Sequence, residues 1–117
     1  MKISKIKELL GAEVLCGADN LDGEVHSACG CDMMSDVLAF VKDQALLMTG
    51  LCNPQVVRTA MMLDMRCIVF VRGKVPSEDV LALANEAGIV ILSTGLRMYV
   101  ACGILYKEGL HGGEIDG

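Results

Sequence analysis

The stretch that decides the fold reads Cys67-Ile68-Val69-Phe70-Val71, and Arg72-Gly73-Lys74 follows it directly. An unbroken apolar run of this kind is typical of a strand that is buried on both faces, as in a parallel sheet. A strand with one face in water would alternate apolar and polar residues instead. The run therefore predicts a central strand in a sheet that carries helices on both sides.

Helical and extended patterns alternate along the rest of the chain. Apolar residues spaced three and four apart predict helices at 2–10, 32–41, 54–65, 77–87 and 96–108. Short apolar runs predict further strands at 13–16, 24–31, 45–49 and 89–92. Asn53 and Ser77 are placed as N-caps of the helices that follow them. Because strands alternate with helices over short connections, we expect one α/β domain with a mostly parallel central sheet flanked by helices.

The length and composition fit one domain. The chain has 117 residues, and we expect the domain over 1–110 and a flexible C-terminal tail over 111–117. A formal net charge of −5 and 3% aromatic residues argue against a nucleic-acid binder, which needs a basic face and stacking platforms. No apolar stretch is long enough to span a membrane and no export signal is present, so we expect a cytoplasmic protein without membrane association.

The apolar content is high for so short a chain, with a mean hydropathy of +0.49. The last predicted helix shows this best, because apolar residues lie around most of its circumference: Leu96, Met98, Val100, Ala101, Ile104 and Leu105. One core covers only one side of such a helix. We therefore expect a homodimer that buries the other side.

Three turns follow predicted strands and combine small, hydroxyl and cationic residues. In open parallel sheets, ligands bind at the carboxyl ends of the strands, where these turns are expected to lie. Glycines let a ligand approach the backbone, and helix N-termini and cations favour an anion such as a phosphate, a nucleotide or a carboxylate. The predicted ligand-binding residues are Thr49, Gly50, Asn53, Arg72, Gly73, Lys74, Ser93 and Thr94. The alternative is that the turns need these residues for their own geometry and that the cations only face solvent.

Motifs for catalysis are mostly absent from the sequence. It contains no phosphate-binding loop of the form Gly-x-x-x-x-Gly-Lys-Ser/Thr, no Gly-x-Gly-x-x-Gly and no Gly-x-Ser-x-Gly. We therefore expect a protein that is not an enzyme and that has no catalytic residue and no cofactor. A different class of function, a small enzyme or a metal- or thiol-dependent redox protein, would use His26, Cys29 and Cys31.

That alternative has a simpler interpretation. Cys29 and Cys31 would project to the same side of a strand, which suits a core as well as a metal. We therefore expect no metal, and we expect the six cysteines to be reduced thiols. Asp32 and Asp36 are open to two interpretations, either as carboxylates for a metal or partner or as residues that complement the start of a helix.

The order of these motifs resembles the DRTGG domain family from about residue 3 to residue 110. The resemblance rests on four stretches, namely Ser35-Asp36-Val37-Leu38, Ala45 to Leu51, Ile68 to Lys74, and Thr94 through Tyr99 to Tyr106. It implies a fold like the N-terminal domain of HPr kinase and a role that is regulatory and not catalytic. It also implies an association with CBS domains in regulated pyrophosphatases, adenine-nucleotide control and a place at a dimer interface.

The chain departs from the residues that give this family its name. On the implied alignment, the family's Asp-Arg falls on Leu51-Cys52, and its Thr-Gly-Gly falls on Val71-Arg72-Gly73. Only Gly73 and the neighbouring cations keep a comparable role. We expect a dimeric, non-catalytic regulatory or ligand-sensing module that binds an anionic small molecule, such as an adenine nucleotide, at the carboxyl ends of its strands.

Overall fold

A five-stranded sheet in the order β1-β5-β4-β3-β2 forms the centre of the molecule, and the computed structural model describes residues 1–41 and 45–112. Its strands are β1 (Glu13–Cys16), β2 (Ser27–Gly30), β3 (Ala45–Thr49), β4 (Cys67–Phe70) and β5 (Val90–Ser93). The pairs β2–β3, β3–β4 and β4–β5 are parallel, and β1 runs antiparallel to β5 at one edge. The predicted mostly parallel α/β sheet is thus confirmed.

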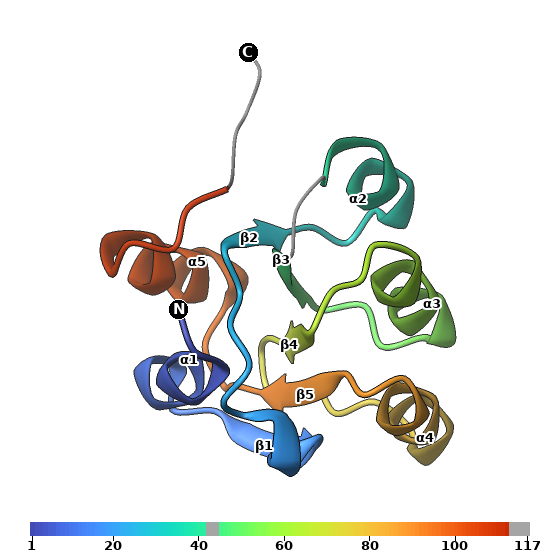
Figure 1. Ribbon diagram of the computed structural model, residues 1–117. Coiled ribbons are helices and arrows are strands. Elements are labelled where there is room, and N and C mark those ends of the chain that lie inside the picture. The colour runs from blue at the N-terminus through green and yellow to red at the C-terminus, as the bar shows by residue number, and fades with distance from the viewer. Residues whose placement is uncertain (42–44, 113–117) are drawn as a thin grey trace.

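Helices cover both faces of this sheet (Figure 1). One face carries α1 (Ile3–Leu10) and α5 (Met98–Lys107), and the other carries α2 (Met34–Phe40), α3 (Pro54–Met62) and α4 (Glu78–Glu86). A short 3-10 helix, η1 (Ala18–Asn20), follows β1. None of the helices in the described part of the chain has the length and apolar character needed to cross a membrane.

Each face of the sheet has its own apolar core, and β3 supplies both. Leu46 and Met48 pack with α1 and α5, whereas Ala45 and Leu47 pack with the helices on the opposite face. All five residues of β3 and all four of β4 are buried. This is why the decisive run at 67–71 has no polar alternation.

Several predicted element boundaries are wrong by a few residues because hydrogen bonds and dihedral angles end the elements earlier. The helix predicted at 54–65 ends at Met62, and Asp64 takes a φ of 53°, which is outside the helical region. The helix predicted at 96–108 begins at Met98, because Leu96 instead bonds the turn after β4 through its carbonyl oxygen. The strand predicted at 24–31 is confined to Ser27–Gly30.

The segment after α5 returns to the outer edge of the sheet. The Ala28 amide of β2 donates to the His111 carbonyl oxygen over 2.9 Å, and the His111 ring stacks on Tyr106 with ring centroids 4.2 Å apart. Most of the predicted tail, residues 113–117, lies outside the described residues.

Candidate functional site

The three predicted turns meet at the carboxyl edge of β3, β4 and β5. The Val71 amide donates to the Thr49 carbonyl oxygen over 3.1 Å, and the Gly73 amide donates to the Thr94 carbonyl oxygen over 2.8 Å. The Arg72 amide donates to the carbonyl oxygen of Leu96, also over 2.8 Å. These bonds hold the turn after β4 between its two neighbours, so residues far apart in sequence share one rim.

Arg72 has an unusual backbone conformation at the middle of this rim. Its φ is 60°, in the left-handed region that residues other than glycine rarely adopt. The residue is exposed, and its guanidinium lies over the backbone of Gly50. A Cβ on Gly50 would collide with Arg72 Nη2 and lie 3.3 Å from Arg72 Cζ. Glycine at position 50 therefore makes room for the guanidinium, while Gly73, with a φ of 69°, and the exposed Lys74 continue the turn.

Asp32 belongs to this rim, although it is absent from the predicted site residues. Its Oδ1 accepts from Thr49 Oγ1 over 2.7 Å and from the Gly50 amide over 2.9 Å. The bond from Thr49, the bond from Gly50 and the nearby Arg72 charge lower the pKa of the Asp32 carboxyl below its ordinary value. The anion position predicted beside Thr49 and Gly50 is thus filled by a carboxylate of the protein itself.

Asp32 does not cap α2, because this helix begins at Met34 and its N-cap residue is Met33, whereas Asp36 does lie in the first turn of the helix. A signal in the sequence could have found the rim contact. Asp32 follows the predicted strand at 24–31, so the rule that places functional residues at the carboxyl ends of strands applies to it as well.

The side-chain oxygens of four predicted site residues form hydrogen bonds with other groups of the protein. Thr49 Oγ1 accepts from the Leu51 amide in addition to donating to Asp32, and Asn53 Oδ1 accepts from the Gln55 amide at the start of α3. Ser93 Oγ donates to the Lys74 carbonyl oxygen, and Thr94 Oγ1 donates to the Leu10 carbonyl oxygen, each over 2.8 Å. These groups shape the rim, whereas Arg72 and Lys74 present charge to solvent.

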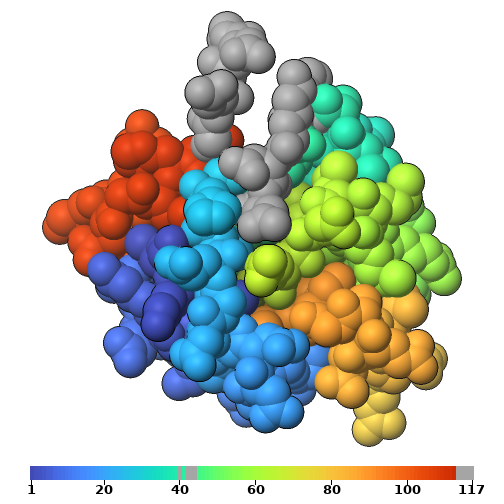
Figure 2. Space-filling model, viewed as in Figure 1, coloured from blue at the N-terminus to red at the C-terminus, as the bar shows by residue number. Residues whose placement is uncertain are grey.

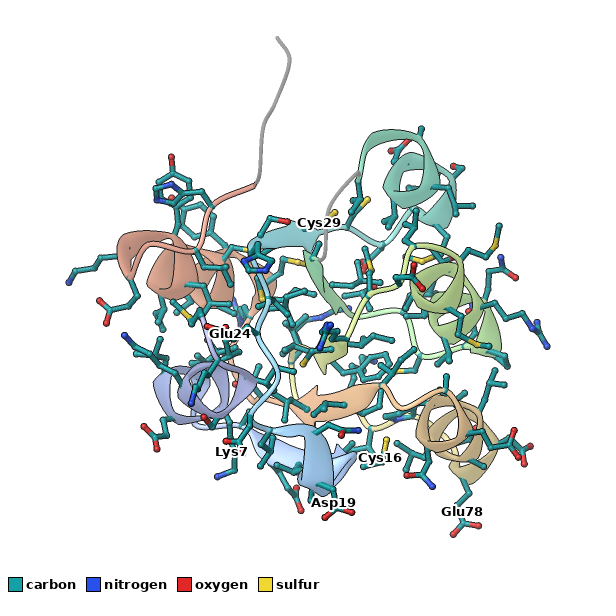
Figure 3. All side chains as sticks on the ribbon, viewed as in Figure 1. Lys7, Cys16, Asp19, Glu24, Cys29 and Glu78 are labelled. Carbon is teal, nitrogen blue, oxygen red and sulfur yellow. The ribbon has the colours of Figure 1, made fainter. Side chains whose placement is uncertain are left out.

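The thiols do not assemble a metal centre in the described residues, where no group of three or more His, Cys, Asp or Glu could hold an ion. Cys29 and Cys31 both pack against the core on the α2–α4 face, and His26 is exposed. Figure 3 places Cys29 on β2 and Cys16 on β1, the two outer strands. Burial raises the pKa of Cys29 to about 11, helped by Cys31 and Cys102, so this thiol is protonated at neutral pH.

A cavity of about 400 Å³ lies at the other end of the strands from this rim. It is lined by Ile3, Asp19, Asn20, Asp22, Gly23, Arg66 and Gly88. Arg66 precedes β4 and Gly88 precedes β5, so this cavity lies at the amino ends of the strands. It is separate from the rim that carries Arg72.

Comparison with known proteins agrees with the fold. The family model of the DRTGG domain matches residues 5–106. A solved structure, the CBS and DRTGG domains of the regulatory region of Clostridium perfringens pyrophosphatase in complex with the activator diadenosine tetraphosphate, is similar with a TM-score of 0.71 and 16% identity. That likeness covers 89% of this chain and 45% of the other, so this chain spans less than half of its solved neighbour. No curated protein matches the sequence.

Proposed function

We propose that this chain, which belongs to the DRTGG domain family, is a non-catalytic regulatory module that senses an anionic small ligand at its carboxyl rim. Family membership confirms the resemblance of the sequence and supports a regulatory role. In the described residues, the rim supplies two exposed cations, Arg72 and Lys74, beside main-chain amides. Recognition of charge is what such a set of groups does best.

The observation that carries this proposal is the conformation of Arg72. A residue with a Cβ in the left-handed region costs roughly 1–2 kcal/mol, and such strain is concentrated at functional sites. On the alignment implied by the family's name, this position is a glycine in Thr-Gly-Gly, which has no such cost. Here the chain carries an exposed arginine at a φ of 60°, directly over Gly50. We infer that the guanidinium is kept for binding.

We propose an adenine nucleotide as the ligand class. The solved neighbour was crystallised with diadenosine tetraphosphate, an adenine nucleotide with a chain of phosphates. Arg72 offers a planar fork for phosphate oxygens, and Lys74 adds a second cation two residues later. Gly50 and Gly73 let the ligand approach the backbone, while Asn53, Ser93 and Thr94 hold the rim in shape.

Arg72→Gly tests the proposal, with Arg66→Gly at the other end of β4 as the matched control. Loss of a charge-assisted hydrogen bond of about 1.5–3 kcal/mol weakens binding roughly 10- to 150-fold. We expect calorimetry with AMP, ATP and inorganic phosphate to show this loss for Arg72→Gly only. The same variant should unfold with an unchanged or higher free energy, because glycine relieves the backbone strain. Equal affinity in Arg72→Gly and the parent chain, or no binding of any of the three at millimolar concentration, contradicts the proposal.

We also propose that the module is a homodimer that associates through α5. Tyr99, Gly103 and Tyr106 lie four and three residues apart and so share one face of the helix. Tyr99 is 90% exposed and Tyr106 63%, and neighbouring Val100 is exposed as well. In Figure 2, α5 forms one flank of the molecule. Two aromatic side chains beside a glycine suit close packing against a second copy.

The cytoplasm remains the compartment that we propose. All six cysteines are free thiols, which suits a reducing environment. Mass spectrometry of alkylated protein from native cells would measure this directly, and a disulfide in the native chain would argue for a different compartment.

A further inference from the structure

We propose that Asp32 is a built-in competitor of the ligand: a phosphate or carboxylate oxygen of the ligand replaces Asp32 Oδ1 between Thr49 Oγ1 and the Gly50 amide, and this exchange releases the start of α2. The inference rests on the proposed function, because it concerns the same rim. It adds a second subsite beside Arg72 and a way for the bound ligand to change the surface of the protein.

The two donors at Thr49 and Gly50 form a position for one anionic oxygen. Thr49 Oγ1 and the Gly50 amide both point at the same atom, Asp32 Oδ1, over 2.7 and 2.9 Å. A second hydrogen bond fixes the orientation of the Thr49 hydroxyl, because Thr49 Oγ1 also accepts from the Leu51 amide over 3.1 Å. Thr49 itself is fully buried, so this donor stays in place whichever anion it meets.

The present occupant of this position can be exchanged. Asp32 is exposed, and it lies on the segment between β2 and α2 and not on a regular element. The Arg72 charge is near enough to help lower the pKa of the Asp32 carboxyl. A phosphate group on Arg72 would therefore arrive beside two donors that already hold a carboxylate. Phosphate presents more acceptor oxygens and more charge than the carboxylate does.

Exchange at Asp32 acts on α2 because the two are adjacent in the chain. Asp32 is separated from the helix only by Met33, which is the N-cap residue. Two described side chains anchor α2 in the core, Met34 at 8% and Val37 at 1% exposure, while Ser35 and Asp36 face solvent. In a helix of only seven residues, the contacts at its start involve a large share of its length. The bond of Asp32 to β3 is one of those contacts.

Competition between Asp32 and the ligand would lower the apparent affinity of the ligand by a factor that can be measured. If Asp32 fills the position in about 90% of molecules, the apparent affinity of the ligand is about tenfold lower than its intrinsic affinity. Asp32→Asn keeps the size of the side chain and removes its charge, and so weakens the competitor. Asp36→Asn on α2 is the matched control, since it removes the same charge from an exposed position four residues later.

The experiment titrates the full chain with inorganic phosphate and, separately, with AMP, by calorimetry and by amide NMR. We expect Asp32→Asn to bind both probes about tenfold more tightly than the parent chain and Asp36→Asn to bind them unchanged. In the parent chain, the Gly50 amide and the amides of Met34 and Val37 should shift together during the titration. In Asp32→Asn, the NMR signal of the Gly50 amide should still shift on binding, whereas the signals of the Met34 and Val37 amides should not. The reason is that the contact of residue 32 with Thr49 and Gly50 is already weakened in this variant.

The results separate this inference from the proposed function. Equal affinity in Asp32→Asn and the parent chain, with α2 amides that do not move, overturns the competitor while the ligand site at Arg72 stands. Binding by neither protein overturns both proposals. If Asp32→Asn does not fold, the titration of the parent chain decides alone: α2 amides that ignore a bound probe overturn the inference, and amides that shift with Gly50 support it.

Discussion

Single residues at the rim show how backbone strain and charge are combined. Arg72 adopts a φ of 60° that glycine would adopt without strain, and Gly50 has no room for a Cβ because the guanidinium lies there. The two positions are therefore neighbours in space: a side chain at 50 would displace the end of the Arg72 side chain from its place over this backbone. A glycine at 72 would relax the turn, whereas the Arg72 charge helps to keep the Asp32 carboxyl ionised. The backbone strain at Arg72 supports the proposed recognition of an anion.

The charge of Asp32 makes a prediction about pH. Its pKa is lowered in the folded protein, so the ionised form stabilises the fold above the unfolded-state pKa, and this contribution is lost as pH falls through the folded-state pKa. We expect the parent chain to exceed Asp32→Asn in unfolding free energy at pH 7. The difference should shrink from about pH 5 downward, as urea denaturation at each pH would measure. A difference that stays constant down to pH 3 would contradict the role of the ionised carboxylate.

At the starts of α3 and α4, the sequence predicts the N-cap residue correctly, but only one of the two residues makes a capping hydrogen bond. Asn53 and Ser77 both occupy the N-cap position that the sequence indicates. Asn53 Oδ1 accepts from the Gln55 amide over 3.0 Å, whereas the Ser77 side chain makes no capping hydrogen bond. The same residue position therefore contributes to stability in α3 through a side-chain bond that α4 lacks.

This difference predicts unequal effects of two matched substitutions. Asn53→Ala should lower the free energy of unfolding by about 1 kcal/mol, because a bonded N-cap is lost. Ser77→Ala should change it by less than about 0.5 kcal/mol, as is usual for a surface side chain without a specific contact. Chemical denaturation of both variants provides the comparison. Asn53→Ser should restore most of the loss, and a loss of ligand affinity in Asn53→Ala with full stability would point instead to direct ligand contact.

The whole molecule has two cores, one on each face of the sheet, and apolar side chains that neither core covers. Ala101 and Leu105 of α5 are buried in one core, while Tyr99 and Val100 remain exposed. Of the other apolar residues predicted around this helix, Leu96, Met98 and Ile104 also pack against that core, so Val100 alone of the predicted set is on the external side, beside Tyr99. The external side is the one that a second copy would cover.

Gly103→Arg tests this surface at the scale of the assembly. A Cβ on Gly103 meets no atom within 4 Å, so a larger side chain fits the single chain but would separate two packed helices. We expect light scattering at micromolar concentration to show a dimer for the parent chain and a monomer for Gly103→Arg, with circular dichroism unchanged. Ala82→Arg, at an exposed position of α4, is the matched control and should remain dimeric. A parent chain that is monomeric at this concentration contradicts the proposed interface.

The order and type of the helices and strands could be predicted because each rests on local periodicity. The rim could be predicted in outline for the same reason, since each turn directly follows a strand. The hydrogen bonds of Asp32 could not, because its partners Thr49 and Gly50 are 17 and 18 residues away, although the place of Asp32 after a predicted strand already pointed to this rim. Thr94 is a similar case, since its hydroxyl bonds a carbonyl oxygen at the end of α1, 84 residues away.

The chain by itself determined the α/β class, the buried central strand and the glycine-rich turns, because apolar spacing and turn chemistry act over a few residues. Only the tertiary structure shows which hydroxyls form hydrogen bonds within the protein and which carboxylate accepts from Thr49 and Gly50. It also shows that the Arg72 guanidinium lies over Gly50. Those outcomes depend on packing that brings distant segments within 3 Å of one another. The charge that the rim presents to solvent therefore depends on the fold, although the residues that carry this charge can be read from the sequence.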